Sequence, residues 1–126
     1  MSRITFVENR GKTIFWASIA RILVARGHTV TWIVQNPTYA PRGFGKACLP
    51  FPRRGDLRET AIPPFLSTDR GRLFFGAGGN HYGHYQGCIA RAIDDLAPDV
   101  LVGEPTLFHE QLILAEARRR DIPYLH

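Results

Sequence analysis

The fold is decided by residues 4–34, which read ITFVENRGKTIFWASIARILVARGHTVTWIV. Residues 4–7 are a short apolar run with a β-branched bias, which predicts a buried strand. Residues 13–26 predict a helix, capped at its end by Gly27, and residues 30–34 predict a second strand. Strand, helix and strand within about 30 residues match one right-handed βαβ unit. The apolar positions that recur at helical spacing are Phe15, Trp16, Ile19, Ile22 and Leu23.

The last third of the chain continues the alternation of helices and strands. A helix is predicted to start after Asn80, its N-cap, and to end at Pro98. Residues 100–102 are a continuous apolar run, typical of a parallel strand buried on both faces. A helix over residues 107–120, with Thr106 as its N-cap, precedes a strand that starts at residue 122. The apolar stripe of the first of these helices is Tyr82, Tyr85, Ile89, Ala92, Ile93 and Leu96.

Residues 35–72 differ in character, because they hold six of the nine prolines together with several glycines and many basic side chains. Regular structure is expected to be sparse there. Residues 46–51 predict one short strand, which Pro50 and Pro52 restrict to a sheet edge. Residues 1–126 are therefore expected to form a single α/β domain with a Rossmann-like, doubly wound parallel sheet, interrupted by this irregular segment.

Two glutamates follow strands that such a sheet would place side by side. Under the usual strand order 3-2-1-4-5, the strand at residues 4–7 lies next to the strand at residues 100–102. Glu8 follows the first and Glu104 follows the second. Ligands of doubly wound sheets bind at this switch point, outside the carboxyl ends of the strands. Glu8 and Glu104 are therefore predicted to face one crevice.

The positive charge is concentrated in the front of the chain. Residues 1–72 hold 12 Lys/Arg and 4 Asp/Glu (+8), whereas residues 73–126 hold 4 and 7 (−3), which together give the net +5. A basic front suits phosphorylated or acidic ligands or the anionic face of a membrane, and a merely solvated surface is the alternative. No nucleic-acid-binding motif accompanies the charge, so nucleic acid is not expected as a partner.

The sequence contains neither a membrane span nor a secretory signal pattern, because Arg21 and Arg26 interrupt the longest apolar stretch and Met1 leads directly into a strand. A cytoplasmic protein is expected, with peripheral membrane contact as a further possibility. Cys48 and Cys88 are 40 positions apart, which argues against a disulfide framework, and both are predicted to be buried thiols.

The sequence partly resembles two nucleotide-binding patterns but lacks residues that each of them requires. Gly11-Lys12-Thr13 occupies the place where a phosphate-binding loop would end, but that pattern requires glycine where this chain has Phe6. The first loop also lacks the glycines of a dinucleotide site, and no acidic residue follows the second strand. No cofactor is therefore expected. Lys12 at a helix start could still contact a phosphate.

Two other clusters have ordinary structural explanations as well as functional ones. His81, His84 and Cys88 would share one helix face and could bind zinc, but the sequence offers no further ligand, so helix packing is preferred and no metal is expected. The glycine-rich residues 76–80 could present backbone N–H groups to an anion, but a flexible turn is preferred.

Several strings of this sequence resemble glycosyltransferases of the GT-B fold. The opening ITFV, the helix containing Ser18-Ile19-Ala20-Arg21-Ile22-Leu23 and the turn ARGHTVT are similar to the start of their N-terminal Rossmann-like domain. Pro98-Asp99-Val100-Leu101-Val102 is similar to the entry of their fourth strand. The stretch GEPTLFHE at 103–110, followed by IPYL at 122–125, resembles the group involved in bacterial surface or capsular polysaccharide synthesis.

The resemblance implies an acceptor-binding domain. The expected reaction moves a sugar from a nucleotide-sugar donor to a glycan or phosphorylated acceptor. Glu8 would then be the catalytic base, Arg10 and Lys12 would hold an acceptor phosphate, and Glu104, Thr106 and His109 would complete the substrate site. The donor, a substrate rather than a cofactor, would bind a C-terminal domain that this chain lacks, so the chain alone is expected to be inactive.

Two other functions remain open from the sequence. The chain could be a stand-alone α/β binding or regulatory module, or it could belong to a nucleotide-sugar epimerase, which shares the two-domain architecture.

Overall fold

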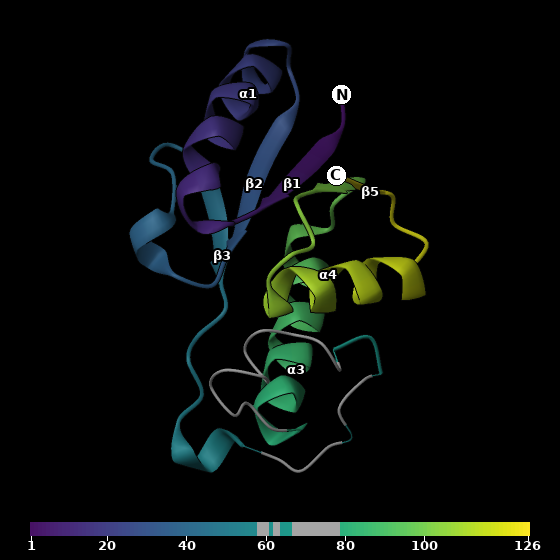
Figure 1. Ribbon diagram of the computed structural model, residues 1–126. Coiled ribbons are helices and arrows are strands. Elements are labelled where there is room, and N and C mark those ends of the chain that lie inside the picture. The colour runs from purple at the N-terminus through teal and green to yellow at the C-terminus, as the bar shows by residue number, and fades with distance from the viewer. Residues whose placement is uncertain (58–60, 62–63, 67–78) are drawn as a thin grey trace.

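A computed structural model describes residues 1–57, 61, 64–66 and 79–126 (Figure 1). Within them lies a parallel sheet whose strand order is β3-β2-β1-β4-β5, as the sequence predicts. The strands are β1 (Arg3–Val7), β2 (Thr29–Val34), β3 (Gly45–Cys48), β4 (Val100–Val102) and β5 (Tyr124–Leu125). The first strand pairs with both β2 and β4, and Phe6 stands in register between Trp32 and Val102. The carboxyl ends of β1 and β4 are therefore neighbours at the switch point.

Among the described residues, three long helices cover the two faces of this sheet. Helix α1 (Thr13–Ala25) lies against one face, and α3 (Gly79–Leu96) and α4 (Phe108–Arg119) lie together against the other (Figure 1). The predicted α/β, Rossmann-like, doubly wound architecture is confirmed. Short 3-10 turns are η1 (Arg10–Lys12), η2 (Pro37–Tyr39), η3 (Arg54–Asp56) and η4 (Pro64–Leu66). In the described part of residues 35–72, only such turns and β3 are regular, and β3 lies at the predicted sheet edge.

The two main helices differ in how well their apolar patterns predict burial. In α3 the predicted stripe is confirmed, because Tyr82, Tyr85, Ile89 and Ile93 are all buried. In α1 the predicted helix is confirmed, but two of its five apolar positions face solvent: Phe15 is 64% exposed and Ile22 is 56% exposed. The α1 residues that are buried in the core are Thr13, Ala17 and Ala20, while Trp16, Ile19 and Leu23 pack partly against it.

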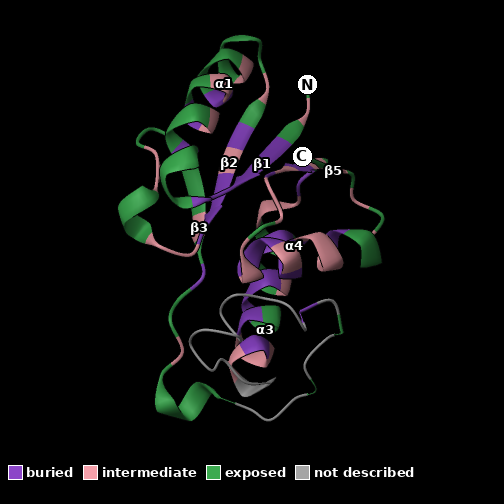
Figure 2. Ribbon diagram, viewed as in Figure 1, coloured by how far each residue is buried: buried purple, intermediate pink, exposed green. Residues whose placement is uncertain are grey.

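The burial of small α1 residues and the exposure of larger ones follow from the bulky side chains on the sheet beneath α1. Phe6 and Trp32 stack at 5.1 Å between ring centroids and occupy the space below the helix. A helix can approach such a surface closely only through small side chains, and the alanines supply them. The outward surface of α1 is consequently exposed along most of its length, as Figure 2 shows in green.

Three smaller expectations need correction. Cys48 is exposed, because it lies on the edge strand β3, whereas Cys88 is buried as predicted. Helix α3 starts at Gly79, so Asn80 is inside the helix and is not its N-cap. Helix α4 starts at Phe108 with Leu107 as N-cap, one residue later than the cap expected at Thr106. Of the glycine-rich segment 76–80, residues 76–78 lie outside the described part of the chain.

The helix boundary at Gly27 confirms the predicted C-terminal cap. Gly27 has φ +86°, a left-handed conformation that glycine adopts without strain. None of the helices among the described residues is long and apolar enough to cross a bilayer.

Candidate functional site

The loops that follow β1 and β4 are joined by a buried hydrogen-bond network. Asn9, directly after Glu8, donates its side-chain amide to both carboxylate oxygens of Glu110 at 3.0 Å and to the Thr106 hydroxyl at 3.1 Å. The Glu110 carboxylate also accepts from the backbone N–H of Leu107 at 2.9 Å and of Thr106 at 3.2 Å. We call residues 8–12 and 104–110 the loop pair. Both loops are held at the switch point, as the sequence predicts.

Glu8 is one of the two most enclosed of the predicted site residues. Its side chain is 1% exposed, and its carboxylate accepts hydrogen bonds from the backbone N–H groups of Arg10 at 2.7 Å, Gln35 at 3.1 Å and Asn36 at 3.3 Å. These contacts connect the end of β1 to the end of β2. The carboxylate therefore lies beneath the surface of the loop pair and not on it.

His109 lies directly behind Glu8. Its Nε2 is 2.8 Å from the backbone carbonyl oxygen of Glu8 and 3.9 Å from the nearer carboxylate oxygen. Because a carbonyl oxygen can only accept, Nε2 carries the proton and donates it. The imidazole is buried to the same extent as Glu8 and anchors the start of α4 against the end of β1.

The remaining predicted residues are on the surface of the loop pair. The Lys12 ammonium lies 2.5 Å from the Glu104 carboxylate, and both side chains are open to solvent. Arg10 and Thr106 are exposed beside them. Arg10 also has φ +42°, a left-handed conformation that strains a non-glycine residue. All six predicted residues thus belong to the loop pair, four on its surface and two below.

Asn9 and Glu110 are the members of this network that the sequence prediction missed. Glu110 lies three residues after the helix N-cap, a spacing at which a glutamate can bond back to the backbone at the start of a helix. That spacing could have identified Glu110. Nothing in the sequence indicates that Asn9, 101 residues away, is its partner.

Burial of Glu110 has an electrostatic consequence. Removal from water raises the pKa of the Glu110 carboxyl, and the hydrogen bonds from Leu107, Thr106 and Asn9 oppose that rise. Burial, together with the nearby charge of Glu110, also raises the pKa of Tyr124 on β5. The Tyr124 hydroxyl is buried and finds no hydrogen-bond partner among the described residues.

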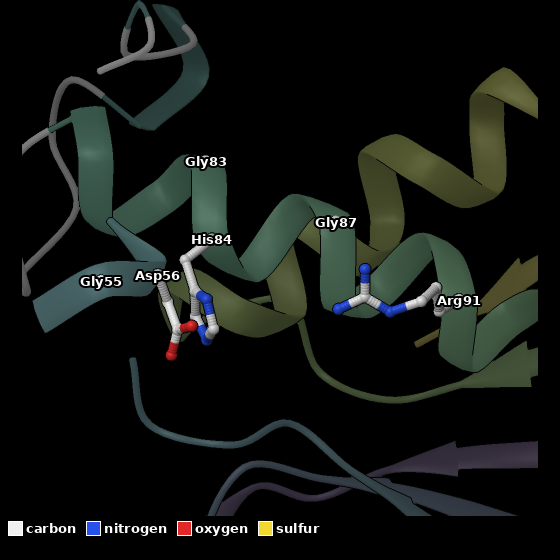
Figure 3. Close-up of a pocket in the computed structure, with 6 residues that line it drawn as sticks. All are labelled: Gly55, Asp56, Gly83, His84, Gly87 and Arg91. Atoms are coloured by element: carbon white, nitrogen blue, oxygen red, sulfur yellow. The ribbon is translucent and has the colours of Figure 1, made fainter. Parts of the chain in front are cut away.

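A second polar surface lies along α3, on the side that faces η3. A hollow of about 330 Å³ is lined there by Asp56, His84 and Arg91, with glycines forming the rest of its described wall (Figure 3). The glycines are Gly55, Gly83 and Gly87. Their missing side chains leave the space open, and the three ionisable groups give it both signs of charge.

The arrangement of His84 and Cys88 does not resemble a metal site. His84 Nε2 is 2.9 Å from the carbonyl oxygen of Pro50, to which it must donate, and the Cys88 sulfur is 3.7 Å away from the same nitrogen. A nitrogen that carries a proton cannot bind a metal. Among the described residues, no group of three His, Cys, Asp or Glu side chains is placed to hold an ion.

Comparisons with known proteins identify the fold. No protein-family model matches the sequence, and no curated protein matches it significantly. Solved structures do match: a glycotransferase of kitacinnamycin, with a TM-score of 0.59 and 19% identity, and the calicheamicin glycosyltransferase CalG4, with a TM-score of 0.55 and 20% identity. This chain has the fold of part of a glycosyltransferase.

The two matches extend over nearly all of this chain but over a minor share of the larger enzymes. Each covers 98% of the present chain, which spans 29% of the kitacinnamycin glycotransferase and 31% of CalG4. The chain is thus similar to one part of these GT-B-like proteins. At these identities the likeness concerns the fold alone.

Proposed function

We propose that this chain is the acceptor-binding part of a glycosyltransferase that moves a sugar from a nucleotide-sugar donor to a glycan or phosphorylated acceptor in polysaccharide synthesis. The observation that carries the proposal is the Lys12–Glu104 ion pair. It sets opposite charges on the surface of the loop pair, at the switch point where doubly wound folds bind ligands. The glycosyltransferase-like fold supports the same reading.

Each exposed residue of the loop pair has a role in this proposal. Arg10 and Lys12 bind an acceptor phosphate, since both are cations at the start of a helix, where the helix dipole also favours an anion. Glu104 and Thr106 accept and donate hydrogen bonds to acceptor hydroxyls. His109 keeps the loop pair in place through its bond to the Glu8 carbonyl oxygen.

Glu8 is the proposed base. The acceptor hydroxyl oxygen attacks the anomeric carbon of the donor sugar, the bond from that carbon to the nucleoside diphosphate breaks, and the hydroxyl proton passes to the Glu8 carboxylate. Because Glu8 is buried, residues 10–12 must move aside before an acceptor can reach it. The strained Arg10 backbone lies in that segment, and relief of the strain lowers the cost of the movement.

The test is a transfer assay on the complete protein that carries this chain. Glu8→Gln keeps the size of the side chain and removes its basicity, so product formation should fall by about 10²-fold or more while donor binding stays within about twofold. Glu104→Gln is the matched control: it should raise the acceptor KM and leave kcat within a few-fold. Equal activity of Glu8→Gln and the parent protein would exclude Glu8 as the base.

A stand-alone α/β binding or regulatory module is the second candidate. It is favoured by the complete burial of Glu8 and His109, which is what purely structural groups show. In that case the complete protein would bind a phosphorylated glycan at the loop pair without turning over any nucleotide sugar. Detectable transfer to any acceptor would eliminate this candidate.

A further inference from the structure

The segment of the chain that contains α1 has an unusual charge distribution. Between Asn9 and Gly55 the chain has no Asp or Glu and eight basic residues, namely Arg10, Lys12, Arg21, Arg26, Arg42, Lys46, Arg53 and Arg54. Of these eight, only Lys12 forms an ion pair within the described part of the chain. The opposite helix layer, α3 and α4, contains acidic groups such as Asp94 and Glu116. Among its Asp, Glu, Lys and Arg residues, the segment that contains α1 is therefore purely cationic.

Helix α1 itself exposes large apolar side chains. Ile14 is 77% exposed and, with Phe15 and Ile22, lies on the outward surface of α1. At 100° per residue, Ile14, Phe15 and Ile22 project within one third of the helix circumference, with Arg21 on one flank and Arg26 on the other. In Figure 2 the green outer side of α1 faces away from the sheet. An apolar strip between arginines is the pattern of a helix that lies in a membrane interface.

A hollow beside these apolar side chains of α1 contains polar groups that can bind phosphate. It measures about 230 Å³ and lies between α1 and η2, where Ser18, Arg21 and Thr38 supply two hydroxyls and a guanidinium. Ile14 and Tyr39 form its apolar rim. A phosphate with an attached hydrocarbon chain would satisfy both kinds of group at once, since arginine and hydroxyls bind phosphate oxygens.

We propose that the outward surface of α1 docks on an anionic phospholipid bilayer, with Ile14, Phe15 and Ile22 entering the interface and Arg21 and Arg26 contacting lipid phosphates. The positive charge of the arginines favours an anionic partner. The apolar side chains select lipid over a nucleic acid, whose phosphate backbone would leave them in water. This goes beyond the proposed function and does not depend on it, because bilayer binding needs neither donor nor acceptor.

The test is flotation of the complete protein with lipid vesicles. Binding to vesicles that contain about 30% phosphatidylserine should exceed binding to pure phosphatidylcholine by tenfold or more, and about 0.5 M salt should weaken it strongly. An interfacial arginine contributes roughly fivefold, so Arg21→Gln with Arg26→Gln should lower the affinity by about 20-fold. Ile14→Ser with Phe15→Ser should lower it by tenfold or more.

Two control variants match these changes elsewhere on the chain. Arg118→Gln with Arg119→Gln removes the same charge from α4, and Phe51→Ser removes an exposed apolar side chain from the loop after β3. Both should bind vesicles like the parent protein, and circular dichroism should show all variants folded. Failure of the complete protein to bind anionic vesicles at low salt overturns the proposal. So does unchanged binding by either α1 variant, or binding to single-stranded RNA that Ile14→Ser with Phe15→Ser leaves intact.

Discussion

Asn9 Nδ2 lies 3.0 Å from each carboxylate oxygen of Glu110, and this contact joins the first loop of the chain to the start of its last helix. The two residues are 101 positions apart. Both are buried, so their hydrogen bonds are not exchanged for bonds to water. The contact therefore holds Asn9 against the start of α4 and keeps the two loops side by side, with Lys12 and Glu104 on their surface.

Replacing Asn9 by Asp should make stability strongly dependent on pH. The substitution sets a second carboxyl against Glu110, and two carboxylates at that separation cannot both be ionised without a large penalty. We expect the free energy of unfolding at pH 7 to drop by about 2–4 kcal/mol and to recover partly as the pH is lowered toward about 4, because protonation of either carboxyl relieves the repulsion. Urea unfolding at both pH values measures this. Asn9→Ala loses the hydrogen bonds without adding charge. Its loss in the free energy of unfolding should therefore change little with pH.

Glu110→Gln should cost more stability in acid than at neutral pH. The folded-state pKa of Glu110 is raised above its ordinary value, so its titration stabilises the parent protein at pH values below the unfolded pKa. That contribution disappears as pH rises through the folded pKa. The glutamine variant lacks it at every pH and also turns an amide N–H₂ toward the Leu107 and Thr106 donors.

In numbers, the Glu110→Gln deficit should be about 1–3 kcal/mol at pH 7 and larger near pH 4. Thermal unfolding of the parent and variant across this range provides the comparison. A deficit that shrinks in acid would mean that the Glu110 pKa is lowered in the folded protein, contrary to the effect of its burial.

Gly103→Ala should destabilise the junction of β4 and β5. A Cβ at Gly103 would lie 2.6 Å from the Tyr124 hydroxyl oxygen and 3.0 Å from the Val7 Cβ. We expect a loss of about 1–3 kcal/mol in the free energy of unfolding. Gly11→Ala is the control, because a Cβ there meets no described atom within 4 Å, and its effect should be below about 1 kcal/mol.

Tyr124→Phe should compensate part of that loss. The Tyr124 hydroxyl is buried without a partner in the described part of the chain, so its removal alone should change stability by less than about 1 kcal/mol. In the double variant, Gly103→Ala with Tyr124→Phe, the contact of the new Cβ with the Tyr124 hydroxyl disappears, while its contact with Val7 remains. The double variant should therefore be less destabilised than the sum of the single changes. Strict additivity would show that Gly103 and Tyr124 do not interact.

Lys12→Ala should affect acceptor binding more than folding. The Lys12–Glu104 pair is exposed, and pairs of this kind contribute about 0–1 kcal/mol to stability. We expect the KM for a phosphorylated acceptor to rise by about tenfold with kcat nearly unchanged, since a contact of similar strength in the ground and transition states is lost. Lys46→Ala, on the edge strand β3, should leave KM as it is. An equal rise for both variants would place the acceptor elsewhere.

The sequence predicted the elements that depend on local periodicity. The βαβ unit, the α3 stripe, the edge position of β3 and the placement of β1 next to β4 all follow from residue patterns, and the structure contains each of them. Helix starts were less accurate. The cap expected at Thr106 lies one residue before the true N-cap, because Glu110 supplies the side-chain bonds that a capping threonine would otherwise make.

The residues of the loop pair could be nominated from the sequence, but their accessibility could not. Position after a strand places Glu8 and Lys12 in the same loop, yet three backbone N–H groups draw the Glu8 carboxylate inward while Lys12 extends to Glu104. Two of those N–H groups belong to Gln35 and Asn36, directly after β2. The direction of a side chain depends on partners that only the assembled sheet brings near.

By itself the sequence determined a doubly wound α/β fold, its switch point and a cationic first half, because strand and helix periods and charge are properties of short stretches of chain. Only the tertiary structure decided that Asn9 meets Glu110, that Glu8 is enclosed, and that α1 turns Phe15 and Ile22 outward. These outcomes depend on packing between residues far apart in the chain. Beneath α1 the bulk of Phe6 and Trp32 left room for alanines at the closest approach, and Phe15 and Ile22 remained in solvent.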